Sequence, residues 1–148
     1  MGFELTDVHI RRALDALAQD HLAVEQALAQ VGYPPPRQRD HSFDSLARIV
    51  IGQQLSTKAA ATIAARVNDA VGGDLKPGAL LDAAPEALRS AGLSKQKIGY
   101  LQSLAEAVLS DELPLSALPT LSDDKVEAAI TSVRGFGRWS AHMYMMFA

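Results

Sequence analysis

Residues that start and stop helices divide this chain into short segments, and no other feature constrains its fold as strongly. Thr6, Ser42, Ser56, Ser94 and Ser122 each precede an apolar pattern with helical spacing, so they are predicted N-caps. No segment shows the two-residue alternation of a β-strand. The 25 Ala and 19 Leu residues together also far outnumber the 20 Val, Ile and Thr residues, which favours helix. We therefore predict an all-α chain of eight or nine short helices.

The predicted helices are unevenly spaced along the chain. Gly32 and the three prolines that follow Tyr33 stop the second helix and make residues 32–41 a stiff linker. The predicted helices cover residues 7–19, 21–31, 43–54, 57–71, 77–84, 85–91, 95–109, 123–133 and 139–148, with Asp20 as the expected cap of the second. We therefore expect residues 1–41 to form one part of the chain and residues 42–148 another.

The charges are unevenly distributed although the formal net charge is only −3. Residues 45–68, 87–105 and 128–148 contain eight of the 14 Lys and Arg residues and no Asp or Glu. If these stretches meet in the folded chain, they form a basic face on an acidic body, as suits a nucleic-acid partner. The alternative is that they lack acids because they are buried helices.

Several classes of protein are excluded by composition. The absence of Cys excludes disulfides, Cys-ligated zinc, iron–sulfur clusters and a thiol nucleophile within this sequence. Residues 1–7 show no secretion signal, and no run of 18 apolar residues occurs that could span a membrane. We expect a cytoplasmic protein with no membrane partner.

A glycine-containing turn joins the last two predicted helices in a helix-hairpin-helix pattern. The turn, Val133-Arg134-Gly135-Phe136-Gly137, lets the backbone approach another surface closely. The free N–H groups at the start of the following helix form a ready phosphate site, and Arg134 and Arg138 flank it. A Gly-x-Gly sequence is also common as a simple helix C-cap. The two arginines and the acid-free helix that follows favour phosphate binding.

Three segments in order resemble the helix-hairpin-helix (HhH-GPD) DNA glycosylase superfamily, most closely its DNA-3-methyladenine glycosylase II branch. They are Phe43–Thr57, Leu88–Leu101 and Arg134–Ala141. The resemblance implies a helical barrel over residues 42–148, with the hairpin at 123–148. It also implies that residues 1–41 are part of a second helical lobe, incomplete without a C-terminal tail.

The resemblance implies a DNA-binding role for the hairpin. Backbone N–H groups of Gly135, Gly137 and Trp139 would hold a phosphate, with Arg134 and Arg138 beside it. The backbone carbonyls of Thr131, Val133 and Phe136 match the positions that bind a monovalent cation, Na⁺ or K⁺, in the family. No other cofactor is implied.

A second implied DNA contact is the loop that enters the minor groove and fills the gap left by a flipped base. It matches Gln53, Gln54 and Leu55, with Gln54 as the residue that fills the gap. Such a wedge offsets part of the cost of base flipping. Considered without the hairpin, Gln53 and Gln54 would be interpreted as a polar helix end.

The position of Trp139 determines the implied chemistry. Strand-cleaving members of the family have a nucleophilic Lys there, and Trp cannot form a Schiff base, so a monofunctional hydrolase is implied. Trp139 and Met143 would line the base pocket, where an indole suits a cationic alkylated purine. The alternative for Trp139 is core packing, and His142 and Tyr144 are assigned structural roles.

No catalytic residue is expected within this sequence. The family's catalytic Asp is expected beyond Ala148, and the apolar residues 143–148 suggest a chain that continues. We therefore expect the sequence to be part of a longer protein, with an uncovered apolar face on residues 1–31.

The resulting functional hypothesis is base-excision repair of damaged duplex DNA. A nucleoid-associated monomer would flip alkylated purines such as 3-methyladenine and hydrolyse their N-glycosidic bond. The first alternative is a helix-hairpin-helix module that binds DNA without catalysis, and the second is a helical interaction protein with no nucleic-acid role.

Overall fold

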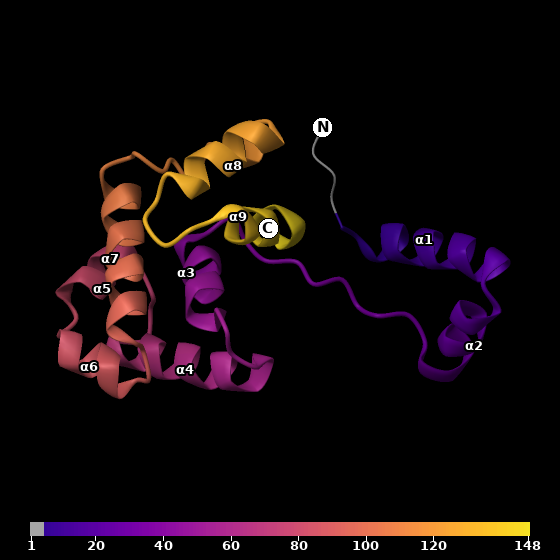
Figure 1. Cartoon of the computed structure of the whole chain (residues 1–148), viewed down its shortest axis with the longest axis horizontal. Helices are drawn as coiled ribbons and strands as arrows, with labels where there is room; N and C mark the ends of the chain where they lie inside the picture. The colour runs from indigo at the N-terminus through magenta and orange to yellow at the C-terminus, as the bar shows by residue number, and fades with distance from the viewer. Residues whose placement is uncertain (1–4) are drawn as a thin grey trace. The chain divides into compact units, whose positions relative to one another are not determined.

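The computed structural model describes residues 5–148 (Figure 1). These residues form α-helices and one 3₁₀ helix, and none of them is in a β-strand, so the all-α prediction is confirmed. No described helix has the length and apolar character needed to cross a membrane. The elements are α1 (Asp7–Asp20), α2 (Leu22–Val31), α3 (Phe43–Gly52), α4 (Thr57–Ala70), α5 (Pro77–Asp82), α6 (Pro85–Ser90), α7 (Lys95–Leu109), η1 (Leu118–Thr120), α8 (Asp123–Thr131) and α9 (Arg138–Phe147).

Most of the predicted caps are formed. The hydroxyls of Thr6, Ser42, Ser56 and Ser94 each accept a hydrogen bond from the backbone N–H three residues on. Ser122 occupies the N-cap position of α8, but its side chain makes no capping bond.

Several predicted helix boundaries were wrong, and the helix predicted over residues 77–84 ends at Asp82. The N-cap of α2 is His21 rather than Asp20, because His21 N–H bonds to Leu17 O and keeps Asp20 within α1. Helix α3 ends at Gly52 because Gln54 adopts a left-handed conformation with φ of 57°. Helix α8 ends at Thr131, before the hairpin turn.

The chain divides into two compact units, the first running to Arg39 and the second spanning Asp40–Met146. In the first unit, α1 packs against α2. Tyr33 ties the segment after α2 to α1, because its hydroxyl donates to Asp15 and its ring lies 4.5 Å from the Arg11 guanidinium carbon. Neither α1 nor α2 has a buried residue.

The second unit is built around α7, which contacts α3, α5 and α6, while α4 contacts α3 and α6. Figure 1 shows α8 and α9 as consecutive helices joined by the hairpin turn. The side chains that fill the centre are aliphatic and fully buried. They include Leu46 and Val50 of α3, Leu101 and Leu104 of α7, and Ile130 of α8. Burying a side chain of this size stabilises a fold by roughly 1.5–3 kcal/mol.

Helix α9 is fixed in the second unit by Tyr144, whose side chain is buried. The Tyr144 hydroxyl lies 2.9 Å from Nδ1 of His41, and the two rings meet edge to face. Burial raises the pKa of Tyr144 to about 12, so its hydroxyl stays neutral. Tyr144 therefore has the structural role that was expected for it.

Candidate functional site

The hairpin turn is anchored from within by two apolar side chains. Val133 and Phe136 are both buried, and the Phe136 N–H donates to Val133 O at 3.1 Å. The residues between and after them, Arg134 and Gly137, are exposed. The sequence therefore holds the turn rigid from its inner side and presents its outer side to solvent.

Helix α9 begins at this turn with its N-terminal amides unpaired. Gly137 is the N-cap and provides no side chain, and there is no acid in the first turn. The N–H groups of Arg138, Trp139 and Ser140 have no acceptor among the described residues. The positive end of the helix dipole and these free donors suit an anion.

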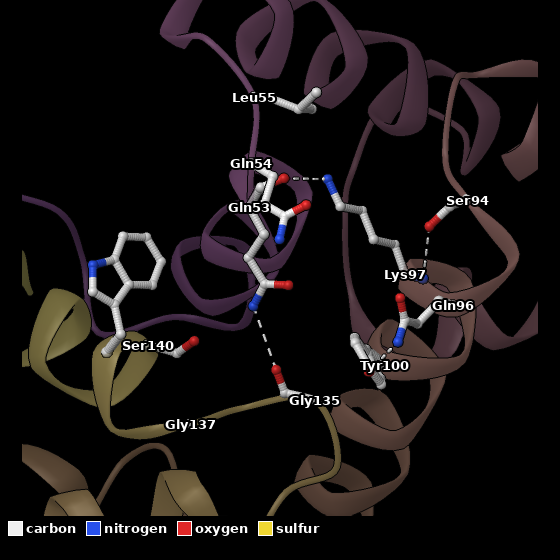
Figure 2. Close-up of a pocket in the computed structure, with 11 residues that line it drawn as sticks. Gln53, Gln54, Leu55, Ser94, Gln96, Lys97, Tyr100, Gly135, Gly137 and Ser140 are labelled. Atoms are coloured by element: carbon white, nitrogen blue, oxygen red, sulfur yellow. Dashed lines mark hydrogen bonds between the residues drawn. The ribbon is translucent and has the colours of Figure 1, made fainter.

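A cavity of about 740 Å³ lies beside this helix start (Figure 2). All three acid-free stretches contribute to it, and no residue of its lining is acidic. The stretches therefore meet in space, as the basic-face hypothesis required. The lining residues are Gln53, Gln54, Leu55, Ser94, Gln96, Lys97, Tyr100, Gly135, Gly137, Trp139 and Ser140.

The predicted wedge residues form one side of this cavity. Gln54 has a left-handed backbone, and Leu55 is 39% exposed. The Gln53 side-chain amide donates to Gly135 O at 3.4 Å, which connects the loop to the hairpin (Figure 2). The side chain of Lys97 reaches the loop from α7. Its Nζ donates to Gln53 O and Ile51 O, at 2.8 Å each.

Trp139 lines the cavity and is 58% exposed. It is therefore not a core residue, and the core-packing alternative is wrong. Met143, the second expected pocket residue, instead packs partly buried against the core and does not line this cavity. Ser140 is only 2% exposed, and its hydroxyl is directed toward the cavity (Figure 2).

The basic face is weaker than the sequence count implies. Arg138 Nε lies 2.9 Å from Glu127 Oε1, and Arg48 Nε lies 2.6 Å from Asp44. Both acids lie one residue outside the acid-free stretches, so counting along the sequence missed them. Arg134 lines a separate hollow that also contains Glu106 and Glu112.

Glu127 joins the two helices of the hairpin motif. Its second carboxylate oxygen lies 2.6 Å from His142 Nε2, so α8 is connected to two residues of α9. The hydrogen bond with His142, and then the charge of Arg138, hold the pKa of Glu127 below its ordinary value. His142 therefore has the structural role that was expected for it.

The carbonyl groups expected to bind a cation lie at the end of α8 and in the turn. Val133 O accepts the Phe136 N–H, whereas the carbonyls of Thr131 and Phe136 receive no backbone N–H from a described residue. This leaves carbonyl oxygens free, as a monovalent cation requires. The described residues contain no cluster of His, Cys, Asp or Glu side chains that could hold a metal ion.

The sequence analysis assigned no role in the site to the cavity residues contributed by α7 and its cap. Ser94, Gln96, Lys97 and Tyr100 all lie within the acid-free stretch 87–105. Both the missing acids and the family resemblance marked this stretch. Neither could indicate which face of α7 points to the cavity.

Known proteins similar to this chain include DNA-3-methyladenine glycosylases. The chain is 32% identical over 121 residues to DNA-3-methyladenine glycosylase 1 of Schizosaccharomyces pombe. The matched region covers 78% of this chain and 53% of that protein. It is 33% identical over 120 residues to DNA-3-methyladenine glycosylase of Saccharomyces cerevisiae, covering 75% of this chain and 40% of that protein. The chain spans about half the length of the curated relatives it matches.

Solved structures show the same fold. The DNA-3-methyladenine glycosidase of Bacillus halodurans superposes with a TM-score of 0.74 and 36% identity, covering 100% of this chain and 67% of that one. The S. pombe 3-methyladenine DNA glycosylase, solved in complex with abasic DNA, superposes with a TM-score of 0.73 and 32% identity, covering 83% of this chain and 63% of that one. The family model described as HhH-GPD superfamily base excision DNA repair protein matches residues 47–146. The chain therefore belongs to the HhH-GPD superfamily.

Proposed function

We propose that this chain binds damaged duplex DNA and flips the base in a DNA glycosylase of the 3-methyladenine type. The complete reaction is the hydrolysis of the N-glycosidic bond of an alkylated purine. The observation that carries the proposal is the composition of one cavity. The predicted wedge, an exposed Trp139 and the free amides of the hairpin all border the same acid-free hollow.

The hairpin would hold a backbone phosphate on one side of the lesion. Its donors are the backbone N–H groups of Gly135, Gly137 and Trp139, with the exposed side chain of Arg138 beside them. The free carbonyls of Thr131 and Phe136, with that of Val133, would hold a monovalent cation that reinforces the positive charge facing the phosphate. Contacts of this kind position the protein without reading sequence.

Gln54 would then fill the space left by the extruded base, supported by Gln53 and Leu55. A flipped base costs a few kcal/mol of lost stacking and pairing. The left-handed backbone at Gln54 makes a sharp bend after α3 and leaves this residue at the edge of the cavity. Because this bend is already ordered in the free protein, the loop loses less conformational entropy when it binds DNA.

The extruded base would meet the Trp139 indole. Alkylated purines such as 3-methyladenine carry a positive charge that an electron-rich ring attracts. The partly exposed indole at the cavity edge is available for such stacking. Trp139 cannot act as an amine nucleophile, so the proposal is hydrolysis without strand cleavage.

Water can replace the base only if the positive charge that develops on the sugar is stabilised. A carboxylate is the group suited to this task, and none lines the cavity in the described chain. We assign that role to the family's Asp, which is not among the residues of this sequence. We expect the protein to act as a monomer on each lesion and to be cytoplasmic and associated with the nucleoid.

No acidic side chain among the described residues lines the cavity, which favours a second candidate function, a helix-hairpin-helix module that binds damaged DNA without cleaving it. The two functions differ in base release. A version of the protein that continues through the family's Asp loop should release alkylated bases from methylated duplex DNA, measured by chromatography of the free base. Release of none would leave the binding module as the function.

DNA binding itself is tested with the 148-residue chain. Its affinity for duplex DNA, measured by fluorescence anisotropy, should fall steeply as salt rises, because phosphate contacts release counterions. Absence of binding even at low salt would reject both candidates.

A further inference from the structure

Lys97 is the one cationic residue in the cavity lining, and it has an unusual set of partners. Its Nζ donates to two backbone carbonyls, Ile51 O and Gln53 O, both at 2.8 Å. No carboxylate lies within ion-pair distance of it among the described residues. The ammonium group therefore holds the backbone and is not paired with a carboxylate.

The two carbonyls belong to the C-terminal end of α3. Ile51 lies in its last turn, and Gln53 is its C-cap. Carbonyls at this end of a helix lack intrahelical partners and carry the negative end of the helix dipole. The local bonds at this helix end, Gln53 N–H to Val50 O and Leu55 N–H to Gly52 O, leave the Ile51 and Gln53 carbonyls to other donors. Lys97, reaching across from another helix, satisfies both carbonyls with a positive charge.

The bend that follows needs such a support. Gln54, directly after the bonded Gln53, has a φ of 57°, which a non-glycine residue adopts at an energetic cost. The additional bond from the Gln53 side chain to Gly135 O is long, at 3.4 Å. The two bonds from Lys97, at 2.8 Å each, are shorter and hold the backbone on this side of the loop. Figure 2 shows the one to Gln53 O.

The start of α7 is itself well fixed. Ser94 caps it through the Lys97 N–H, and Ile98 and Leu101 are buried in the core. Burial also lowers the pKa of the Lys97 ammonium by desolvation, as expected for a group held at the cavity wall rather than in open solvent. A rigid helix therefore presents the ammonium group to the loop.

We propose that Lys97 is a positioning residue for base extrusion, which holds the Gln53–Gln54 bend in the shape that inserts into DNA. The inference rests on the proposed function for its role in DNA, but the loop geometry can be tested without DNA. Lys97 contacts no reacting atom in this role, and it acts through Gln54.

The first experiment measures amide hydrogen exchange in the free 148-residue chain. Lys97→Met keeps the aliphatic stem and removes the charge and both bonds. Exchange of the amides of residues 53–55 should accelerate by about tenfold, the equivalent of roughly 1.4 kcal/mol of lost hydrogen bonding. Amides in the middle of α7 should keep their rates.

Lys95→Met is the matched control, because Lys95 is exposed, lies two residues away on α7 and has the same charge. It should leave the exchange of residues 53–55 unchanged. Lys97→Arg retains a cation and donors and should recover part of the protection. Equal exchange of residues 53–55 in wild type and Lys97→Met would overturn the inference.

The second experiment measures base unstacking with a fluorescent base analogue beside an abasic site in a duplex. Lys97→Met should reduce the unstacking signal at saturating protein several-fold more than it reduces affinity. The double variant Lys97→Met/Gln54→Ala should be no worse than Gln54→Ala alone, because both act through one loop. Additive losses would show that Lys97 contributes only charge.

The two experiments separate this inference from the proposed function. If wild type and Lys95→Met both fail to bind or unstack duplex DNA, the proposed function fails. Hydrogen exchange then still decides whether Lys97 holds the loop. If wild type unstacks the base and Lys97→Met does so equally well, the positioning role is wrong while the proposed function stands.

Discussion

The ring of Tyr100 fills the space where a side chain at Gly135 would have to be. A Cβ atom built on Gly135 would lie 2.1 Å from Cγ of Tyr100, well inside van der Waals contact. Gly135 also has a φ of 92°, in the left-handed region that favours glycine. The ring comes from α7 and the glycine from the hairpin, so this contact sets how closely the hairpin approaches the cavity wall.

Gly135→Ala is expected to lower the free energy of unfolding by about 2–4 kcal/mol, because it adds backbone strain to overpacking against the ring. Urea denaturation measures this change. Combining it with Tyr100→Ala should cost less than the sum of the two single variants, since the smaller residue leaves room for the new methyl group. Strict additivity would mean that the two residues do not meet as described.

Gly137→Ala should behave in the opposite way. A Cβ at Gly137 meets nothing within 4 Å, and its φ of −100° suits any residue. We expect a loss of stability of only about 1 kcal/mol or less, from the poorer N-cap. Affinity for duplex DNA should fall about tenfold, and equally for all sequences, because the methyl group blocks approach of a phosphate that carries no base information.

Gly78→Ala is the matched control for this variant, since it also adds a methyl group in open space, away from the cavity. It should bind DNA as wild type does. A change in sequence preference in Gly137→Ala, rather than a uniform loss, would contradict the hairpin assignment.

Gln54→Ala should reduce base unstacking more than duplex binding, because the side chain acts after the base has left the stack. Alanine is also strained at a φ of 57°, so Gln54→Gly is needed as a strain-free variant. Both should show the same loss in the fluorescent unstacking assay. Parallel losses of affinity and unstacking would remove the wedge role.

Trp139→Leu should leave stability within about 0.5 kcal/mol of wild type, because the indole is 58% exposed and outside the core. It should lower the preference for a duplex that carries a cationic alkylated purine over a normal one by about threefold to tenfold. Competition binding measures this preference. A large decrease in the thermal stability of Trp139→Leu would instead show that Trp139 has a packing role.

Glu127→Gln should strengthen duplex binding a few-fold at low salt. The change removes a negative charge beside the hairpin and frees Arg138 for phosphate, and screening should reduce the gain as salt rises. Weaker binding would mean that Glu127 mainly fixes α9 in place.

The same variant should alter the pH dependence of stability. The pKa of Glu127 is lowered in the folded chain, so the charged carboxylate stabilises the fold above its ordinary pKa, near 4.5. That contribution disappears as the pH falls through the lowered pKa. Glu127→Gln should therefore lose less stability than wild type between neutral pH and pH 3, measured by urea denaturation at each pH. An equal loss of stability in wild type and Glu127→Gln over this pH range would contradict a stabilising role for the Glu127 carboxylate.

The sequence by itself determined the helices and the hairpin. Capping residues such as Ser42 and Ser94 act on the next three residues, and Gly32 acts on its own backbone, so these signals need no tertiary partner. The family resemblance and the acid-free stretches also pointed to the three segments that border the cavity.

Only the tertiary structure decided which side chains of those segments line the cavity, pair with each other or hold the backbone. The bonds of Lys97 to α3 and the contact of Tyr100 with Gly135 join residues 35 or more positions apart, through faces that no local pattern reveals. The pairing of Arg138 with Glu127 depends on how α8 and α9 cross. Charge and polarity are properties of residues, but whether a charge is free, paired or holding a backbone depends on neighbours that the fold supplies.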